Sequence, residues 1–473
     1  MPTVKPFRAL RYEPDAVGDL GLVTSPPYDV IGPDEQRRLL ARHPKNVVRL
    51  DLPPDELGDE PDDRYRRAAK TLATWRSDGT FHKDPRPSIY AYEQTYRLTA
   101  TGTERVQRGF FARLRLEAFG RGSGILPHEQ TLAGPREDRY KLLRATGANL
   151  SPVVGMYQDP SGRASQILGQ VVDGVAGSAA ADVVDDDGTR HRMWVVPAEL
   201  HPADGGAHQA GADHGGSPPS TSPAGVLVAS RPIAAELIDL ASAGPIAIAD
   251  GHHRYETALR YRDERRMTRS CEEDPAFDYI LALLLETTAE PPTVLPTHRV
   301  VAGADGADRG SLIDRAEDLF EVERDVTADR LVAEFNGSSG GGRGRLGLWS
   351  ADDGGRGAIL TARRARFDQW LPPGGNALRR LDVTLLGIAL DRLCGVDAAR
   401  VAAGGRVAYT KSAREAIDWV EARRDGSDAA FLLEPTPVAD VVAVARDGDL
   451  MPQKSTYFFP KPLSGLVINP HEW

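Results

Sequence analysis

Cysteine is almost absent from this chain of 473 residues, which contains only Cys271 and Cys394. The two lie far apart in the sequence and form no Cys-x-x-Cys pair, which excludes a disulfide framework and a thiolate metal site. The longest apolar run near the middle, residues 279–285, is far shorter than a membrane span. The first residues show no apolar stretch of the kind found in a secretory signal. We therefore expect a cytoplasmic protein with no membrane partner.

An excess of positive charge is also missing, because 58 Lys and Arg residues stand against 68 Asp and Glu residues, for a net charge of -10. Nucleic-acid binding without sequence preference needs a basic face, so we do not expect a nucleic-acid partner. The hydrophobic share of 41% is that of an ordinary globular protein. The length allows two or three domains and leaves the oligomeric state open.

Hydrophobic periodicity predicts a mixed α/β fold, with an N-terminal α/β region over residues 1–104, a core over 105–305 and a C-terminal α/β region over 306–473. The predicted helices cover residues 34–42, 62–78, 137–144, 233–241, 255–265, 382–393 and 412–423. The predicted strands cover residues 46–52, 89–98, 105–116, 245–249, 279–285, 346–349, 406–409 and 430–433. Residues 201–225 consist mainly of Gly, Ser, Pro, Ala and His, which predicts a flexible insertion.

The stretch Asp250-Gly251-His252-His253-Arg254 follows directly on the predicted strand 245–249, and a helix starts at once. Gly251 permits the tight backbone turn. Free N–H groups at the helix start, two imidazoles and a guanidinium together favour a phosphate or carboxylate ligand. Asp250 could orient a histidine or hold a metal ion; alternatively, it only caps the helix and the histidines are surface residues. We predict that the active site lies at this turn.

Three further segments carry candidate residues. In the C-terminal run 451–461, Lys454, Ser455, Thr456 and Lys461 would add hydrogen-bond donors if the run folds over the site. The alternative is that residues 457–459 form a core strand with lysines at its ends. Thr297-His298-Arg299 offers another cationic pair. Arg139 and Lys141 are typical of the solvated face of a helix.

The motifs at residues 249–258 (ADGHHRYETA), 126–131 (LPHEQT) and 451–461 (MPQKSTYFFPK) resemble a widespread bacterial and archaeal family of unknown function. This resemblance covers nearly the whole chain. The Asp-Gly-His-His-Arg turn is also similar to that of the ParB/sulfiredoxin-like superfamily, in which free serine kinases carry it together with an upstream Pro-His-Glu. The second resemblance implies a ParB/sulfiredoxin-like core with additional N- and C-terminal α/β regions.

In those kinases the turn holds the nucleotide phosphates, and the upstream glutamate is the base toward the substrate hydroxyl. The resemblance therefore implies that Glu129 is the catalytic base, and that Asp250 and His252 act with it. It also implies phosphate or nucleotide binding by Gly251, His253 and Arg254, and Mg²⁺ binding by Asp250. The two motifs lie further apart here than in the compact kinases, and the alternative for Glu129 is a solvated loop acid.

Phosphoryl transfer needs cations around the phosphate oxygens and a carboxylate that accepts the hydroxyl proton. We therefore predict a nucleotide-dependent phosphotransferase that uses ATP or ADP with Mg²⁺ and acts on a small hydroxyl-bearing metabolite such as serine. Two alternatives stay open: a metal-dependent hydrolase that uses Asp250, His252 and His253, and a non-catalytic nucleotide-binding switch or adaptor. The substitution Arg254→Ala is expected to abolish nucleotide binding with little loss of stability.

Overall fold

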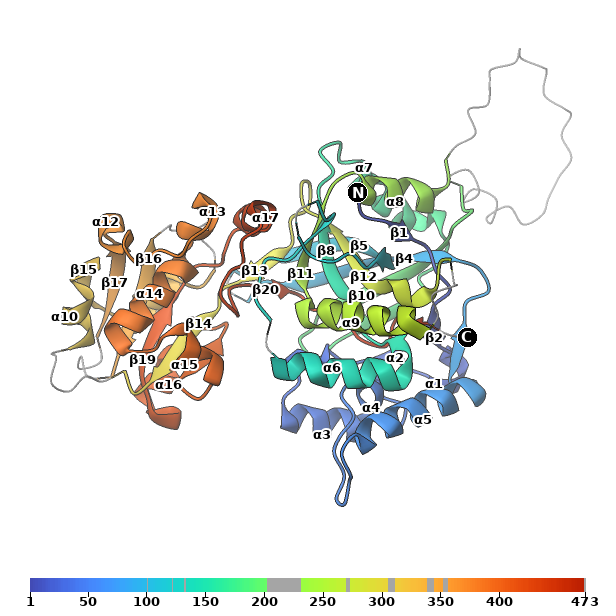
Figure 1. The fold of residues 1–473 in the computed structure, drawn as a ribbon, viewed down its shortest axis with the longest axis horizontal. Coiled ribbons are helices and arrows are strands. Elements are labelled where there is room, and N and C mark those ends of the chain that lie inside the picture. The colour runs from blue at the N-terminus through green and yellow to red at the C-terminus, as the bar shows by residue number, and fades with distance from the viewer. Residues whose placement is uncertain are drawn as a thin grey trace, which may run out of the picture.

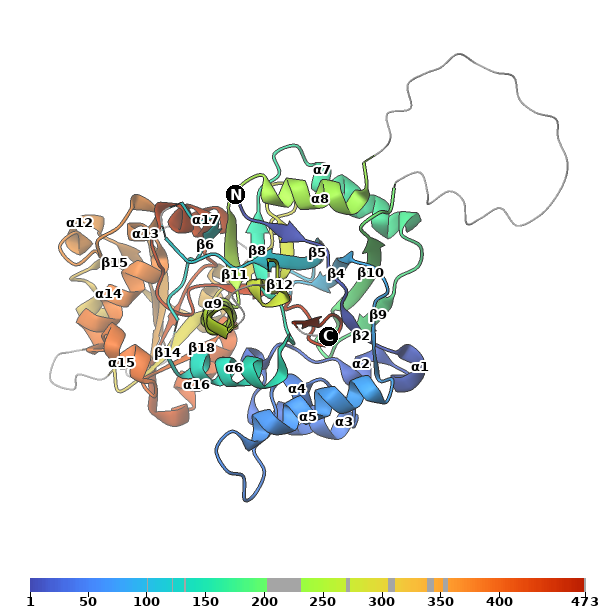
Figure 2. The same cartoon turned by 45° about the vertical axis from the view of Figure 1, so that its right-hand side comes forward.

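The computed structural model describes residues 1–99, 101–120, 122–131, 133–201, 231–268, 273–304, 311–337, 344–351 and 356–471. Helices and strands are mixed along these ranges, which confirms the predicted mixed α/β class. Figures 1 and 2 show two parts side by side, each built on its own sheet. We call residues 297–450 the small lobe and the rest the large lobe. Apart from His201, the predicted flexible insertion lies outside the described residues.

The large lobe is built on a nine-stranded mixed sheet in which β11 runs parallel to β6 and β12 parallel to β8. The path β6-β11-β8-β12-β5-β4-β10-β9 orders it, and β1 pairs with β5. Its strands are β1 (Val4–Lys5), β4 (Ser88–Arg97), β5 (Glu104–Arg115), β6 (Ile125–Leu126), β8 (Val153–Tyr157), β9 (Ala181–Val184), β10 (Arg190–Pro197), β11 (Ile246–Asp250) and β12 (Tyr279–Glu286). The apolar run predicted as a central strand is β12, which is buried along its whole length.

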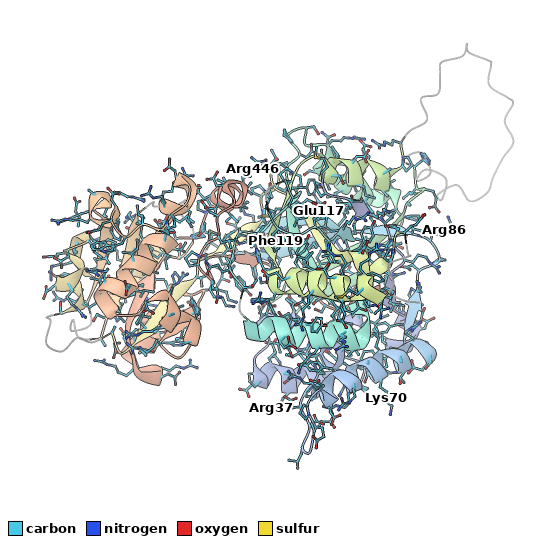
Figure 3. The ribbon with its side chains drawn as sticks, in the orientation of Figure 1. Arg37, Lys70, Arg86, Glu117, Phe119 and Arg446 are labelled. Atoms are coloured by element: carbon cyan, nitrogen blue, oxygen red, sulfur yellow. The ribbon has the colours of Figure 1, made fainter. Side chains whose placement is uncertain are left out.

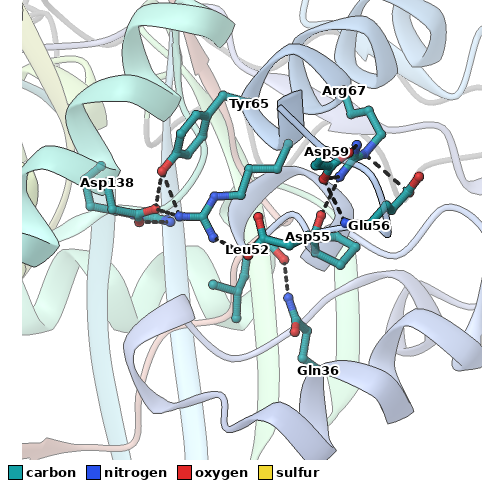
Figure 4. A network of polar contacts seen from close by, with 11 residues as sticks. Gln36, Leu52, Asp55, Glu56, Asp59, Tyr65, Arg67 and Asp138 are labelled. Atoms are coloured by element: carbon teal, nitrogen blue, oxygen red, sulfur yellow. Dashed lines mark hydrogen bonds and ion pairs between the residues drawn. The ribbon is translucent and has the colours of Figure 1, made fainter. Parts of the chain in front are cut away.

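One face of this sheet is covered by α7 (Arg163–Gln170), α8 (Ile233–Ser242) and α9 (His252–Thr268), whose apolar side chains share a core with the strands. Figure 1 shows α6 (Ala133–Thr146) and then α5 (Asp63–Ser77) stacked outside α9. The hydroxyl of Tyr65 on α5 donates to Asp138 on α6 at 2.7 Å, and Arg67 pairs with Asp59 of the preceding loop (Figure 4). The first contact joins α5 to α6, and the hydroxyl of Tyr140 on α6 in turn donates to Glu264 on α9.

Short elements complete the large lobe. The helices are α1 (Pro14–Val17), α2 (Leu20–Val23), α3 (Pro33–Arg42) and α4 (Val48–Asp51), with the 3-10 turn η1 (Tyr28–Val30). Strand pairs form between β2 (Leu10–Tyr12) and β3 (Phe81–Lys83), and between β7 (Ala148–Asn149) and β21 (Asn469–Pro470). The C-terminal segment covers the other face of the large sheet, where the amide of Leu463 donates to the hydroxyl of Tyr92.

The small lobe contains a six-stranded sheet with the order β15-β17-β16-β19-β14-β18. These strands are β14 (His298–Ala302), β15 (Phe320–Val326), β16 (Arg345–Ser350), β17 (Gly357–Ala362), β18 (Val407–Thr410) and β19 (Ser427–Leu432). One face packs against α11 (Ala328–Glu334) and α16 (Ala413–Glu421), and the other against α10 (Leu312–Ala316), α13 (Asn376–Arg379) and α14 (Asp382–Cys394). The remaining helices are α12 (Arg364–Phe367), α15 (Ala398–Ala403) and α17 (Val438–Asp447).

Two connections join the lobes. β13 (Thr293–Leu295), which leads into the small lobe, pairs with β20 (Tyr457–Phe459), which leads back out of it. Figure 1 shows this strand pair between the two sheets. Arg446 of α17, labelled in Figure 3, donates to the side-chain oxygen of Gln158 in the large lobe. None of the helices in the described ranges has the length and apolar composition that crossing a membrane requires.

Two predictions from the sequence are wrong. Residues 46–52 were expected to form a strand, but they contain the helical turn α4. The Asn46 side chain accepts a hydrogen bond from the amide of Val48 and donates to the carbonyl of Leu22, and such local bonds compete with strand pairing. Arg139 was expected on a solvated helix face, but it is 5% exposed and donates to the carbonyl of Asp51.

Candidate functional site

The corner between β11 and α9 carries the predicted site. β11 ends at Asp250, Gly251 turns the chain with a φ of 88°, and α9 begins at His252. A Cβ at Gly251 would lie 3.0 Å from Nε of Arg254, and a side chain at this φ would also be strained. The turn therefore requires glycine. The first N–H groups of α9 have no carbonyl partner within the helix, so this end of α9 favours an anion.

Asp250 is held between two cations. Its Oδ2 accepts a hydrogen bond from Nη2 of Arg254 at 2.8 Å, and its Oδ1 accepts one from Nζ of Lys461 at 2.7 Å. Burial by itself would raise the pKa of Asp250, but the charges of Lys461 and Arg254 outweigh it and hold that pKa well below its usual range. Arg254 is buried and also donates through Nη1 to the carbonyl of Pro152. Both Nη groups of Arg254 thus have partners inside the protein.

The histidine at the start of α9 is tied to a second histidine. Nδ1 of His128 donates to the carbonyl of Ile248 at 2.6 Å, which leaves its Nε2 to accept from the hydroxyl of Thr456 at 3.2 Å. Nε2 of His252 accepts from the amide of His128 at 3.3 Å. Burial lowers the pKa of His128 to about 4 and lowers the pKa of His252 well below its ordinary value. Both imidazoles are therefore neutral near pH 7 and bring no positive charge to the site.

Glu129 is tied to the C-terminal run. Its Oε1 accepts from the amide of Lys454 at 3.1 Å, and the amide of Met451 donates to the carbonyl of His128 at 2.7 Å. Burial raises the pKa of Glu129 to about 7, although the Lys454 amide and ammonium counteract the rise. A carboxyl that is half ionised at neutral pH suits a general base. The run 451–461 thus folds over the site, which was the condition set for its candidate donors.

A cavity of about 570 Å³ opens at this corner and is lined by both lobes. Such a volume is typical of small-molecule sites. The large lobe and the returning segment contribute Tyr28, Asp29, Val30, Glu129, Gln130, Ala249, Asp250, Gly251, His252, His253, Arg254, Gln453, Lys454, Thr456, Tyr457 and Lys461. The small lobe contributes Thr297, Tyr409, Thr410 and Lys411. Four of these side chains are Lys or Arg and three are Asp or Glu, so the lining has a small positive excess when the histidines are neutral.

The structure brings most of the predicted site residues to this cavity and leaves a few outside. Those on its wall are Glu129, Asp250, Gly251, His252, His253, Arg254, Thr297, Lys454, Thr456 and Lys461. Ser455 is 4% exposed and donates to the carbonyl of Pro452. His298 is buried, and its Nδ1 accepts from the amide of Leu433. Residues 457–459 form strand β20 of the two-stranded pair with β13, in which Phe458 is buried and Tyr457 lies on the wall of the same cavity.

No group of three His, Cys, Asp or Glu side chains is placed to hold a metal ion among the residues that the structure describes. Asp250 was predicted as a Mg²⁺ ligand, but each of its oxygens accepts a hydrogen bond from a cation. His252 and His253 are adjacent at the start of α9, and Nε2 of His252 faces a backbone amide. The corner as folded does not suit the metal-dependent hydrolase considered from the sequence.

Some lining residues were missed from the sequence. Tyr28 and Asp29 lie in η1, directly after Pro26-Pro27, and the rigid turn that these prolines form is a signal of this segment in the sequence. The guanidinium of Arg139 lies 3.9 Å from the centroid of the Tyr28 ring. Lys411 follows β18 of the small lobe, and nothing near it in the sequence indicates that it reaches the corner.

A family model described as "Protein of unknown function (DUF1015)" matches residues 4–384. The chain therefore belongs to this family, which confirms the first resemblance drawn from the sequence. No curated protein matches the chain.

Solved structures show a low similarity. "Free serine kinase in complex with AMP" is 11% identical, and the match covers 72% of this chain and 86% of that chain with a TM-score of 0.32. A mutant of that kinase in complex with ADP is 11% identical, with coverage of 72% and 87% and a TM-score of 0.32. "SbnI with C-terminal truncation" from Staphylococcus aureus is 9% identical, with coverage of 73% and 83% and a TM-score of 0.30. Function has to be argued from the site itself at this level of similarity.

Proposed function

We propose that the cavity at the corner of β11 and α9 binds a nucleotide, and that the protein transfers a phosphoryl group from it to a small hydroxyl-bearing metabolite. One observation carries the proposal: a carboxyl with a raised pKa shares the cavity with a helix N-terminus and with two lysines that form no ion pair with any residue the structure describes. These are the parts that phosphoryl transfer needs, namely a proton acceptor and fixed positive charge around the phosphate oxygens.

The phosphate end of the nucleotide would bind at the start of α9. The N–H groups of the first turn and the end of the helix dipole stabilise an anion there. Among the described residues, Lys454 and Lys411 line the cavity without forming an ion pair, whereas Lys461 is paired with Asp250. Arg254 acts as a positioning residue in this scheme, because it fixes Asp250, which in turn holds Lys461.

The substrate hydroxyl would be activated by Glu129. Its Oε1 is held by the Lys454 amide, so Oε2 is left to accept the hydroxyl proton. As the O–H bond breaks, the substrate oxygen attacks the terminal phosphorus, the bond to the bridging oxygen breaks, and the nucleotide leaves with one phosphate fewer. The raised pKa makes the Glu129 carboxylate a stronger base than an ordinary glutamate, and about half of it is ionised at pH 7.

Mg²⁺ would enter with the nucleotide as part of the substrate. It would offset the negative charge of the transferred group. Among the described residues, two lining carboxylates form no ion pair, Glu129 and Asp29. Glu129 is the proposed base and Asp29 is exposed, so Asp29 is the side chain best suited to face the metal. Asp250 is less suited, since Arg254 and Lys461 already use both of its oxygens.

Transfer of labelled phosphate from Mg·ATP and Mg·ADP to a panel of small hydroxyl compounds, serine and homoserine included, tests the proposal. The Glu129→Gln variant should lose about 10²- to 10⁴-fold in rate, the usual contribution of a general base. Glu421→Gln, at an exposed position on α16, is the matched control and should leave the rate unchanged. Absence of transfer by the wild-type protein to every acceptor, or an unchanged rate in Glu129→Gln, would contradict the proposal. Nucleotide binding without transfer would support the switch or adaptor instead.

A further inference from the structure

We propose that Lys411 of the small lobe is a ligand for the outer phosphates of the bound nucleotide, so that a polyphosphate chain bridges the two lobes. This inference rests on the proposed function for the class of ligand. It adds a second subsite that belongs to the small lobe.

The position of Lys411 is the first argument. It follows β18 directly, and the neighbouring Tyr409 and Thr410 also line the cavity. The Lys411 ammonium lies 3.9 Å from the centroid of the Tyr457 ring, and the Lys461 ammonium lies 4.6 Å from the same ring. A lysine of the small lobe therefore reaches a ring that belongs to the segment covering the glycine corner. The two ammonium groups lie within reach of one extended ligand.

The balance of charge is the second argument. Lys461 has a partner in Asp250, but Lys411 and Lys454 form no ion pair among the residues described. Partial burial lowers the pKa of Lys411, and the charges of Lys461 and Lys454 lower it further, while Asp187 and Glu415 counteract the shift. Ammonium groups that repel one another at a cavity wall are stabilised when an anion with several charges enters.

The distribution of the cations over the two lobes favours a chain of phosphates over a single phosphate. The end of α9 and Lys454 belong to the large-lobe side of the cavity, where one phosphate group can satisfy both. Lys411 belongs to the small lobe, so a ligand that contacts Lys411 as well as these groups joins the two lobes. A diphosphate or triphosphate chain can do so, and each hydrogen bond between charged groups adds about 10- to 100-fold in affinity.

Calorimetric titration with inorganic tripolyphosphate and with orthophosphate tests this subsite without needing a nucleoside. The wild-type protein should bind tripolyphosphate at least about tenfold more tightly than orthophosphate. Lys411→Met keeps an unbranched side chain against Tyr457 but removes the charge, so it should lose this preference and retain its affinity for orthophosphate. Lys70→Met is the matched control, because Lys70 is an exposed residue of α5 away from the cavity (Figure 3), and its preference should equal that of the wild type.

Each other outcome is decisive. If Lys411→Met binds tripolyphosphate as tightly as the wild type, the subsite is wrong while nucleotide binding at the corner stands. If the wild type binds Mg·ATP but shows no preference for tripolyphosphate, the bridging ligand is again wrong and the proposed function stands. If the wild type binds neither tripolyphosphate nor Mg·ATP, both proposals fall.

Discussion

Replacing Glu129 by glutamine should stabilise the protein at alkaline pH and leave its stability nearly unchanged in mild acid. The carboxyl has an ordinary pKa of 4.5 and a pKa of about 7 in the folded protein. Between these values the folded state binds more protons at this site than the unfolded state, so the stability that Glu129 contributes falls as the pH rises. The difference between the two pKa values corresponds to a loss of about 3 kcal/mol in the free energy of unfolding at high pH. Because the side chain is partly exposed, we expect a loss of about 2 kcal/mol.

Urea unfolding of the wild type and of Glu129→Gln, followed by circular dichroism at pH 5 and pH 8, measures this difference. The variant should gain about 2 kcal/mol over the wild type at pH 8 and less than about 1 kcal/mol at pH 5. Glutamine can still accept the hydrogen bond from the Lys454 amide, so the comparison isolates the charge. The difference in stability between Glu421→Gln and the wild type should be the same at both pH values. A variant that is less stable than the wild type at pH 8 would refute the burial of a carboxyl at this position.

Three further predictions follow from the site. Arg254→Met should lower the free energy of unfolding in urea by about 2 to 4 kcal/mol, because it breaks a buried ion pair with Asp250. This value revises the small loss of stability expected from the sequence. Arg37→Met, which breaks an exposed ion pair, is the control and should change the free energy of unfolding little. Burial lowers the pKa of His298 to about 3, so the stability that the neutral ring contributes is complete above about pH 6.5 and is lost as the pH falls. His298→Gln should therefore reduce the slope of the free energy of unfolding against pH in acid by up to about 1.4 kcal/mol per pH unit. An unchanged slope in urea unfolding would contradict the burial of His298. The rate of phosphoryl transfer should rise between pH 6 and pH 8 with a midpoint near 7, whereas a flat profile would argue against Glu129 as the base.

The local features of the site follow from the sequence. The apolar run before Asp250 predicts a buried strand, and a glycine followed by a helical pattern predicts the turn, because only the backbone and its nearest neighbours decide these conformations. The helices α5 and α16 are local in the same way, and the structure confirms both.

The chemical state of the site depends on residues far away in the chain. Arg254 was expected to face an anion, but the Pro152 carbonyl and Asp250 engage its Nη groups, and no pattern near the corner indicates the first of these partners. His252 was expected to help attract phosphate, but burial against His128 keeps it neutral. Lys411 comes from the other lobe. These contacts arise from tertiary packing, which periodicity and motif spacing do not encode.

Titration of Mg·ATP into the wild-type protein and into Lys454→Gly is the most direct test of whether the cavity holds nucleotide phosphates. Lys454 has a φ of 56°, a conformation that glycine adopts without strain, so the variant should stay within about 1 kcal/mol of the wild type in stability. Its affinity for Mg·ATP should nevertheless fall at least about tenfold, because the cavity loses an ammonium group that pairs with no carboxylate in the described part of the chain. Equal affinity in the two proteins, or no heat of binding in the wild type, would contradict the account.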